Sequence, residues 1–429
     1  MNTPECRSCG ARDVRPFLSL GTTPLADALL HEHDLVATEP RFPLDVGFCT
    51  RCTLVQILDT VPPEQLFVDN YHYFSSFSDA LLAHARDHAT RLMADHNLGP
   101  DDLVVELASN DGYLLRNFVE AGIPVLGIDP SPGPAHAAID AGIPTLMEFF
   151  GTDLATWLRA AGHRAKVVIA NNVMAHVPDL NGFVEGIRIL LADDGVATIE
   201  NPCVTDLVDH CEFDTIYHEH HCYFSTTAVA ALMRRHELVL NDVEYFPDLH
   251  GGTMRWTVSH GGDPSPAVRE TLAREQAIGA TEYGYYASFG SRVESLRDEL
   301  RALLCELKAR GATIAAYGAA AKGATLCNYV GIGRDLVDFV VDRNVHKQGR
   351  YMPGTHQPIL APEALLAAPP DYVLLLAWNF RAEIIAQQTE YLRRGGRFIV
   401  PVPWPEISPA EPAIPERVGT QTGWKEPVG

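Results

Sequence analysis

Short apolar runs alternate with amphipathic stretches through the middle of the chain. Runs of four or five apolar residues predict buried strands, and the stretches between them place apolar residues at helical spacing. Because strands that alternate with helices form parallel sheets, this pattern predicts a doubly wound α/β unit. Its predicted strands are Leu103–Leu107, Val125–Ile128, Lys166–Ala170, Val196–Ile199 and two adjacent strands within 238–259, joined by a turn that contains His250, Gly251 and Gly252.

The alternation restarts in a second, smaller α/β unit after a long amphipathic helix. This helix is predicted over 285–309, because apolar residues recur there on one face. A further helix is predicted over 78–97, and the proline-rich segment from 403 is predicted to be irregular. The elements predicted in the second unit are strands Thr313–Tyr317, Val337–Val341, Tyr372–Leu376 and Arg397–Val402 and a helix over 381–394.

The chain divides into four predicted segments. Its 429 residues are too many for one ordinary core, so several domains are expected. The predicted segments are a small, turn-rich domain at 1–75, the first α/β domain at 76–280, the second α/β domain at 281–405 and a proline-rich tail at 406–429.

The charge of the chain limits its partners. Net charge is −22, which opposes sequence-independent binding to nucleic acid or anionic membranes. No apolar run reaches the ~18–20 residues that a membrane span needs, and the first residues lack the pattern of a signal peptide. We therefore expect a cytoplasmic protein that binds neither nucleic acid nor membranes and is a monomer or a weak homo-oligomer.

Two cysteine pairs near the N-terminus predict a metal site. Cys6 and Cys9 form one pair with two residues between them, and Cys49 and Cys52 form the other. Four thiolates bind zinc tetrahedrally and leave no coordination position open, so the predicted Zn²⁺ is structural and the first domain is a zinc-binding domain. The alternative is a set of ordinary buried cysteines.

Residues suited to a nucleotide-type cofactor lie at the ends of strands in the first α/β unit, where such cofactors bind. Glu106 ends the first strand, before a tight turn with Ala108 and Gly112 that lacks the G-x-G-x-x-G pattern of a pyrophosphate binder. Asp129 ends the second strand, where a carboxylate can accept hydrogen bonds from both ribose hydroxyl groups.

A histidine-rich run concentrates acid–base and metal-binding groups in five consecutive residues, Tyr217, His218, Glu219, His220 and His221. Histidine titrates near neutral pH and is the commonest metal ligand, so the run suits either purpose. An extended strand would place Tyr217, Glu219 and His221 on one face, whereas a helical turn would group Tyr217, His220 and His221. The sequence leaves both arrangements open.

Six segments together resemble the sugar-nucleotide C-methyltransferases of deoxysugar biosynthesis. They are ELASNDGYLL, ANNVMAHVPDL, FDTIYHEHHCYFS, LHGGTMRW, YGAAAKGATLCNY and VVDRNVHKQGRYMPGTH. The resemblance covers the chain up to about residue 405. It implies a zinc-binding N-terminal domain, a class I methyltransferase core that binds S-adenosylmethionine, and a C-terminal Rossmann-like domain.

The resemblance also implies a reaction on a nucleotide-linked, usually thymidine diphosphate (TDP), 4-keto-6-deoxyhexose. A base removes the proton at C3, and the enolate carbon takes the methyl group of S-adenosylmethionine. His220 matches the general base, Tyr217 and Glu219 flank it, and His176 matches a histidine near the sugar oxygens. The cofactor contacts implied by the same correspondence are Glu106, Ala108, Asn110, Asp129 and Asn171.

The substrate contacts follow partly from the resemblance and partly from local chemistry. Tyr71 and Asn172 match substrate-facing residues of the family. In the second α/β unit, Lys322 follows a strand in a turn of small residues, and Asp342 ends the next strand before a basic cluster that begins with Arg343. Such a site suits a nucleotide diphosphate. The alternative is a Rossmann unit that acts only as a scaffold.

Three departures from the family concern the site. Ala108 stands where glycine is usual, Glu200 is followed by Asn201 where relatives often carry an aromatic residue, and His221-Cys222 replaces more ordinary residues. The last two lie near the predicted sugar and leave its substituents open.

Three other functions compete with methylation at C3. Methylation at C5, on the other side of the ketone, would use the same enolate chemistry. A metal-dependent hydrolase would use the His-Glu-His cluster as ligands and would need a second metal besides zinc. A zinc-ribbon binding module without enzymatic activity would leave most of the chain unassigned.

Overall fold

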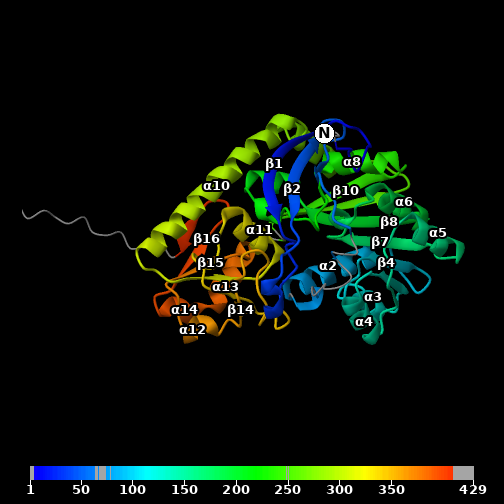
Figure 1. Cartoon of the computed structure of the whole chain (residues 1–429). Coiled ribbons are helices and arrows are strands. Elements are labelled where there is room, and N and C mark those ends of the chain that lie inside the picture. The colour runs from blue at the N-terminus through cyan, green and yellow to red at the C-terminus, as the bar shows by residue number, and fades with distance from the viewer. Residues whose placement is uncertain are drawn as a thin grey trace, which may run out of the picture.

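The computed structural model describes residues 4–62, 66, 74–77, 79–247, 249 and 251–408. Within these residues the chain forms three sheets, of four, seven and six strands. The two larger sheets belong to separate α/β units, and the smallest lies between these units, beside the long helix α10 (Tyr283–Ala309) (Figure 1).

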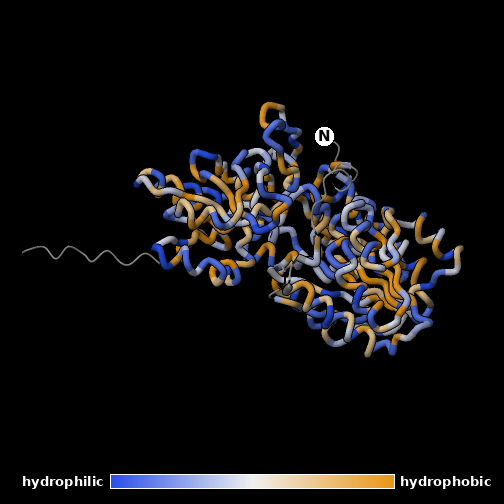
Figure 2. Tube along the Cα trace, turned by 90° about the horizontal axis from the view of Figure 1, so that it is seen from below, coloured by the Kyte–Doolittle hydropathy of each residue, from blue (hydrophilic) through white to orange (hydrophobic). Residues whose placement is uncertain are grey.

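The seven-stranded sheet is the core of the first unit and has the order β10-β11-β8-β7-β4-β5-β6. Strands β4 to β8 pair in parallel, and β11 is antiparallel to both of its neighbours. A parallel sheet is buried on both faces, which explains why its strands are apolar runs (Figure 2). The strands are β4 (Leu103–Leu107), β5 (Val125–Ile128), β6 (Thr145–Leu146), β7 (Ala165–Asn171), β8 (Leu191–Pro202), β10 (Val239–Phe246) and β11 (Thr253–Ser259).

The helices of the first unit pack around this sheet (Figure 1). They are α2 (Asp79–Asp95), α3 (Arg116–Glu120), α4 (Pro132–Asp140), α5 (Thr152–Ala160), α6 (Leu180–Leu190), α7 (Val204–Asp209), α8 (Thr226–Arg235) and α9 (Pro266–Ala277), with the short 3-10 helices η2 (Ser75–Phe77), η3 (Met174–His176) and η4 (Phe213–Thr215). Among these helices, none is both long and apolar enough to cross a membrane, and the same holds for the rest of the described chain.

The predicted strands of the first unit are confirmed, although β7 and β8 are longer than predicted and the two-residue strand β6 was not predicted. Strand β8 begins at Leu191, whereas the sequence predicts a strand over Val196–Ile199. Polar residues between these points hide the strand from an apolar pattern, but backbone pairing with β7 extends to Ala165↔Leu191. Of the predicted turn between β10 and β11, His250 lies outside the described residues.

The six-stranded sheet has the order β14-β13-β12-β15-β16-β17, parallel except for the last pair. The predicted helix over 381–394 is interrupted at Gln388, and the strand predicted over Val337–Val341 covers only its last two residues. The strands are β12 (Ile314–Tyr317), β13 (Val340–Val341), β14 (Ile359–Leu360), β15 (Tyr372–Leu375), β16 (Arg397–Val400) and β17 (Glu406–Ser408). The helices are α10, α11 (Ala321–Val330), α12 (Ala364–Ala367), α13 (Arg381–Gln387), α14 (Thr389–Arg393) and η5 (Trp378–Phe380).

The prediction of an irregular segment from 403 is wrong for strand β17, Glu406–Ser408. This strand pairs with β16, antiparallel, through Ile399↔Ile407. Three residues beside several prolines are too few to show a period in the sequence, and the backbone of β16 supplies the partner.

The four-stranded sheet joins the N-terminal domain to the rest of the chain. Strands β1 (Val14–Thr23), β2 (Phe42–Cys49) and β3 (Val55–Ile57) come from the N-terminal domain, with η1 (Glu32–Val36) between the first two, but the fourth, β9 (Cys222–Tyr223), directly follows the histidine-rich run. The apolar face of this sheet belongs to the same core as α10 and the six-stranded sheet.

Candidate active site

The turn after β4 is built from three left-handed residues in five positions. Ala108, Asn110 and Gly112 have φ of +56°, +51° and +74°. Asparagine and glycine tolerate this region, whereas alanine in it costs of the order of 1 kcal/mol. The departure of Ala108 from the usual glycine therefore places a strained residue at the predicted cofactor loop.

Asp129 holds this turn in place from the end of β5. Its Oδ2 accepts the backbone N–H of Asn110 at 2.9 Å, and its Oδ1 accepts that of Ser131 at 2.8 Å. The Asn110 side chain in turn accepts the N–H of Ser75 at 2.8 Å, which ties the turn to the segment before α2. Each carboxylate oxygen of Asp129 keeps a lone pair for a ribose hydroxyl group.

Glu106 lies beneath the same loop, with 1% of its surface exposed. Its Oε2 has no hydrogen-bond partner among the described residues. Burial, with Asp129 and Asp111 adding negative charge nearby, raises its pKa well above the ordinary value. A buried acceptor of this kind needs a partner, and a ligand that donates a hydrogen bond supplies one.

A cavity of about 110 Å³ opens beside the turn. Ala108, Asp129, Phe150, Val173 and His176 are among the residues that line it. An apolar slot that ends at a carboxylate suits a planar base joined to a ribose. The cavity therefore brings together two predicted cofactor contacts and one predicted catalytic residue.

The histidine-rich run forms a turn that pairs Tyr217 with His220. The N–H of His220 donates to the carbonyl of Tyr217 at 2.9 Å, and the two rings lie 4.1 Å apart. Because the carbonyl of Thr215 accepts from His220 Nδ1 at 2.9 Å, the proton of the neutral ring lies on Nδ1. The lone pair is then on Nε2, 3.0 Å from the Tyr217 hydroxyl group.

Burial keeps His220 in its neutral form. It lowers the pKa of the ring well below its ordinary value, with a further contribution from His176. The two rings lie 4.7 Å apart at an angle of 60°. The proton acceptor predicted from the sequence is thus present in its basic form at neutral pH, next to the wall of the cofactor cavity.

The side chain of Glu219 points away from His220. Its Oε1 accepts the backbone N–H of Asp27 at 3.4 Å, whereas its main-chain carbonyl accepts from His176 Nδ1 at 2.7 Å. Burial and the charge of Asp27 raise the pKa of its carboxyl group to about 8. Glu219 therefore supports the site through its backbone, by orienting His176.

The other two histidines of the run, His218 and His221, lie against neighbouring segments. His218 Nε2 donates to the carbonyl of Pro43 at 3.1 Å. His221 is completely buried, and its backbone N–H donates to Ala175 at 2.7 Å. Both belong to the contact between the run and the neighbouring segments.

Two asparagines lie at the end of β7, directly before Val173 of the cavity wall. Asn172 has φ of +53°, and its N–H donates to the carbonyl of Glu200 at 2.7 Å. The side-chain oxygens of Asn171 and Asn172 are buried without a hydrogen-bond partner among the described residues.

The two predicted substrate contacts of the second unit differ in burial: Lys322 is partly buried and Arg343 is exposed. Lys322 Nζ donates to Asn379 at 3.1 Å and lies 4.8 Å from the Trp378 ring, close to the buried carboxyl group of Asp214. Arg343 is exposed and pairs with Glu383 at 3.2 Å. Tyr71 lies outside the described residues.

The carboxylate of Asp342 forms hydrogen bonds with the backbone of its own unit. It accepts the N–H groups of Ala319 and Asn344 at 2.7 and 2.8 Å. This is the same arrangement as at Asp129, at the end of the second strand of the other α/β unit.

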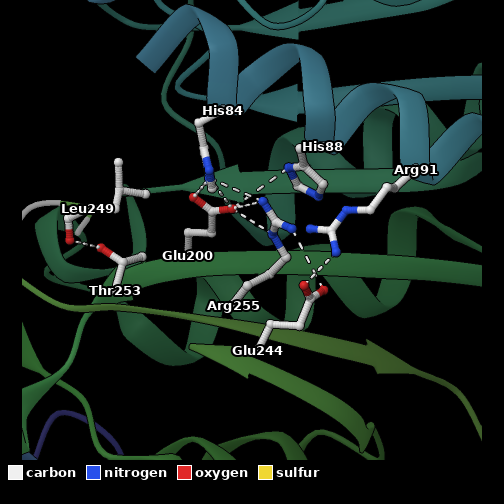
Figure 3. Close-up of polar contacts among 8 residues, drawn as sticks. All are labelled: His84, His88, Arg91, Glu200, Glu244, Leu249, Thr253 and Arg255. Atoms are coloured by element: carbon white, nitrogen blue, oxygen red, sulfur yellow. Dashed lines mark hydrogen bonds and ion pairs between the residues drawn. The ribbon is translucent and has the colours of Figure 1, made fainter. Parts of the chain in front are cut away.

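An ion network between α2 and the strands that carry Glu200, Glu244 and Arg255 was not predicted (Figure 3). Glu200 lies at the end of β8 and receives hydrogen bonds from Arg255 Nε at 2.6 Å and His84 at 3.1 Å. Arg255 also lies 3.7 Å from Glu244, which pairs with Arg91 at 2.6 Å. The signal in the sequence is that polar residues of α2 recur every three or four residues beside its apolar face.

The charges of this network compensate one another. Burial alone would raise the pKa of Glu200, but the hydrogen bond from His84 and the positive charge of Arg255 hold it at about 2. Glu200 and Arg255 are therefore both ionised in a site where they have 1% and 2% exposure. Helix α2 is thereby fixed to strands β8, β10 and β11 of the seven-stranded sheet.

The four predicted cysteines form one cluster. Their sulfur atoms all lie within 4.8 Å of one another, with Cys6 and Cys52 at 3.4 Å and Cys9 and Cys49 at 3.7 Å. A tetrahedral zinc with bonds of ~2.3 Å needs sulfur–sulfur distances of ~3.8 Å, so the cluster fits this ion. Among the described residues, no other group of His, Cys, Asp or Glu side chains gathers in this way.

Three family models match consecutive parts of the chain. They describe a zinc binding domain over 6–67, a methyltransferase domain over 80–242 and a C-methyltransferase C-terminal domain over 248–403. The C-methyltransferase NovU of Streptomyces niveus is 38% identical over 413 residues, which cover 96% of this chain and 98% of that protein. The chain belongs to the C-methyltransferase family.

Other relatives match a smaller share of the chain. A ubiquinone biosynthesis O-methyltransferase of Methylobacterium is 32% identical over 117 residues, which cover 25% of this chain and 45% of that protein. The magnesium protoporphyrin IX methyltransferase of Synechocystis has a TM-score of 0.34 at 17% identity, over 42% of this chain and 83% of that one.

The C-methyltransferase uses S-adenosylmethionine, and its seven-stranded unit has the class I methyltransferase fold. Its N-terminal domain is a zinc-binding domain. A metal-dependent hydrolase would need a second group of metal ligands, and the described residues contain only the four-cysteine cluster. A binding module without activity is inconsistent with the family.

Proposed function

We propose that this C-methyltransferase acts on a TDP-linked 4-keto-6-deoxyhexose and methylates it at C3, next to the ketone. The observation that carries the proposal is the geometry of His220. Its Nδ1 is bonded to Thr215, so Nε2 is the proton acceptor, and its ring lies 4.7 Å from that of His176, which lines the cofactor cavity. A ketone acidifies the neighbouring C–H, so a neutral imidazole beside a methyl donor suits C-methylation.

His220 Nε2 takes the proton from the carbon next to the ketone, and the electrons of the broken C–H bond form an enolate. Bound S-adenosylmethionine supplies an electrophilic methyl group with a neutral thioether as leaving group. The enolate carbon uses the same electron pair to form the new carbon–carbon bond. The proton stays on His220 as an imidazolium until it passes to water.

Tyr217 and His176 form hydrogen bonds with the oxygen atoms of the sugar. The Tyr217 hydroxyl group is 3.0 Å from His220 Nε2, within reach of an enolate oxygen that forms beside this base. His176 is oriented by the carbonyl of Glu219 at 2.7 Å. Both roles need neutral groups that donate or accept a hydrogen bond, and burial lowers the pKa of His176 to about 4.

We assign the sugar end of the substrate to Tyr71 and Asn172 and the diphosphate to Lys322 and Arg343. The unpartnered side-chain oxygen of Asn172 supports a ligand contact at the end of β7. Lys322 lies near the carboxyl group of Glu212, whose pKa is raised by burial to about 8. That group is protonated at pH 7, whereas Asp214, whose pKa burial raises to about 6, is mostly ionised, so a phosphate at Lys322 meets one carboxylate charge and not two.

Methylation at C5 is the alternative outcome of the same chemistry, because both carbons flank the ketone. The test is incubation of the enzyme with S-adenosylmethionine and TDP-4-keto-6-deoxyglucose or its 3-amino and 2-deoxy derivatives. We expect transfer of one methyl group, with the new methyl signal coupled through carbon to C3 in the NMR spectrum of the product. A methyl group at C5 would correct the position, and one on oxygen or nitrogen would contradict the enolate mechanism.

A further inference from the structure

The histidine-rich run, Tyr217 to His221, is the catalytic run of the proposed mechanism, and it continues directly into the sheet of the zinc-binding domain. Strand β9 begins two residues after His220 and pairs with β3 through Val55↔Tyr223 and Gln56↔Cys222. The N–H of Ile57 also donates to the carbonyl of His221 at 3.0 Å. The place of His220 in the folded protein is therefore fixed by pairing with β3, a strand of another domain.

The second cysteine pair determines where β3 starts. The N–H of Cys49 donates to the carbonyl of Leu54 at 2.8 Å, and the N–H of Thr53 donates to the carbonyl of Cys49 at 2.9 Å. These bonds close the loop that carries Cys49 and Cys52. A metal ion held by both cysteines stabilises this loop and, with it, the first residue of β3.

Gln56 connects β3 to the first cysteine pair. Its side chain is 2% exposed, accepts the N–H of Arg7 at 2.8 Å and donates to the carbonyl of Glu5 at 3.0 Å. These two residues flank Cys6. The same residue, Gln56, thus pairs with the catalytic strand through its backbone and with the zinc-binding loop through its side chain.

The first zinc-binding loop is itself fixed to the methyltransferase domain. Asn181, at the start of α6, donates to the carbonyl of Arg7 at 2.8 Å. Arg235, at the end of α8, donates to the carbonyl of Ser8 at 2.6 Å. The loop is anchored on the same domain that holds the cofactor cavity.

We propose that Gln56 is a positioning residue that couples the zinc-binding loops to the catalytic run and so fixes His220 relative to the methyl donor. The bound metal orders the two loops. Gln56 fixes β3 to the first of these loops through its side-chain hydrogen bonds, and β3 holds the C-terminal end of the run through its pairing with β9. The proposal rests on the proposed role of His220 as the base.

The test compares Gln56→Met with Gln357→Met in the full-length, zinc-loaded enzyme. Gln357 is the matched control, because it is also buried, makes hydrogen bonds of the same kind to Ile332 and Thr355, and lies in the C-terminal unit. Four properties are measured: zinc content, S-adenosylmethionine affinity, turnover, and hydrogen exchange of peptides that span 215–223.

We expect Gln56→Met to keep its zinc and its S-adenosylmethionine affinity. Turnover should fall by about tenfold or more, because a displaced base loses most of the contribution of general base catalysis. Exchange over 215–223 should become faster, whereas the peptides of β4 and β5 exchange as in the unchanged enzyme. Gln357→Met should leave the exchange of 215–223 unchanged.

Unchanged exchange over 215–223 in Gln56→Met would overturn the positioning role, whichever residue is the base. Faster exchange with unchanged turnover would overturn the link to catalysis. Substitution of His220 itself tests the proposed function separately, so the two failures are distinguishable.

A second pair of variants keeps the test valid should Gln56→Met not fold. Arg235 is exposed, and Arg235→Ala removes its hydrogen bond to the carbonyl of Ser8. Arg234→Ala is the control, because Arg234 is the exposed residue next to it. We expect faster exchange over 215–223 in Arg235→Ala alone. Equal exchange in both variants would contradict the coupling.

Discussion

Single side chains in this site depart from their ordinary chemistry because the surrounding segments bury them. Ala108 adopts φ of +56° in a turn held by Asp129, although its side chain disfavours that region. His220 loses its charge through burial, and Glu219 keeps its proton for the same reason. These states depend on contacts between residues that are distant in the chain. The sequence could therefore name these residues as candidates for the site, but it could not predict their protonation states.

Glu219→Gln should change how stability depends on pH. The pKa of Glu219 is raised to about 8 in the folded chain, from an ordinary value of 4.5. Between these values the folded chain holds a proton that the unfolded chain has lost, so the free energy of unfolding falls as pH rises, by up to ~1.4 kcal/mol per unit. Glutamine has no such proton, and the fall from pH 5 to pH 8 should be smaller in the variant.

Urea unfolding at pH 5, 6, 7 and 8 measures this difference. Glu299→Gln on the exposed face of α10 is the control and should follow the unchanged enzyme. An equal pH dependence in Glu219→Gln and the unchanged enzyme would show that Glu219 is ionised in the folded state.

At the scale of elements, the apolar pattern predicted the central strands well because parallel strands are buried on both faces. Strand β9 could not be predicted in this way. It has two residues, and its partner β3 is more than 160 residues earlier in the chain, so only the fold brings the two together. The histidine-rich run forms a turn that brings Tyr217 and His220 together, as in the helical-turn alternative, but the sequence left this alternative and the extended strand equally open.

The ion network between α2, β8 and β11 should stabilise the fold through the pairing of its charges. Arg255→Met leaves the buried carboxylate of Glu200 without its partner, and such a loss costs about 3–5 kcal/mol. We expect a fall of this size in the free energy of unfolding, measured with urea at pH 7. The double variant Arg255→Met with Glu200→Leu should recover part of the loss, because no charge then remains buried.

Arg381→Met is the matched control for this measurement. Arg381 pairs with Glu406 at 3.2 Å, but both side chains are more than half exposed. Such a pair contributes about 0–1 kcal/mol. Equal effects of Arg255→Met and Arg381→Met would contradict the role of the network.

At the scale of the whole molecule, the candidate site is built where the three domains meet. The zinc-binding sheet holds the C-terminal end of the histidine-rich run through β9, and the C-terminal unit holds the segment before the run, where Trp378 Nε1 donates to Asp214 at 2.7 Å. The methyltransferase domain supplies the cofactor cavity and His176. The family resemblance predicted the residues of the candidate site, but only the packing of the domains shows that contacts from more than one domain hold them.

The central claim, that His220 is the base that forms the enolate, is tested most directly by exchange of the substrate proton in deuterium oxide. His220→Asn and the exposed control His163→Asn are incubated with a TDP-4-keto-6-deoxyhexose, with and without S-adenosylmethionine. Loss of the base should lower both deuterium incorporation next to the ketone and methyl transfer by about 100-fold or more, with S-adenosylmethionine affinity unchanged. Incorporation and transfer in His220→Asn at the rates of His163→Asn would contradict the account.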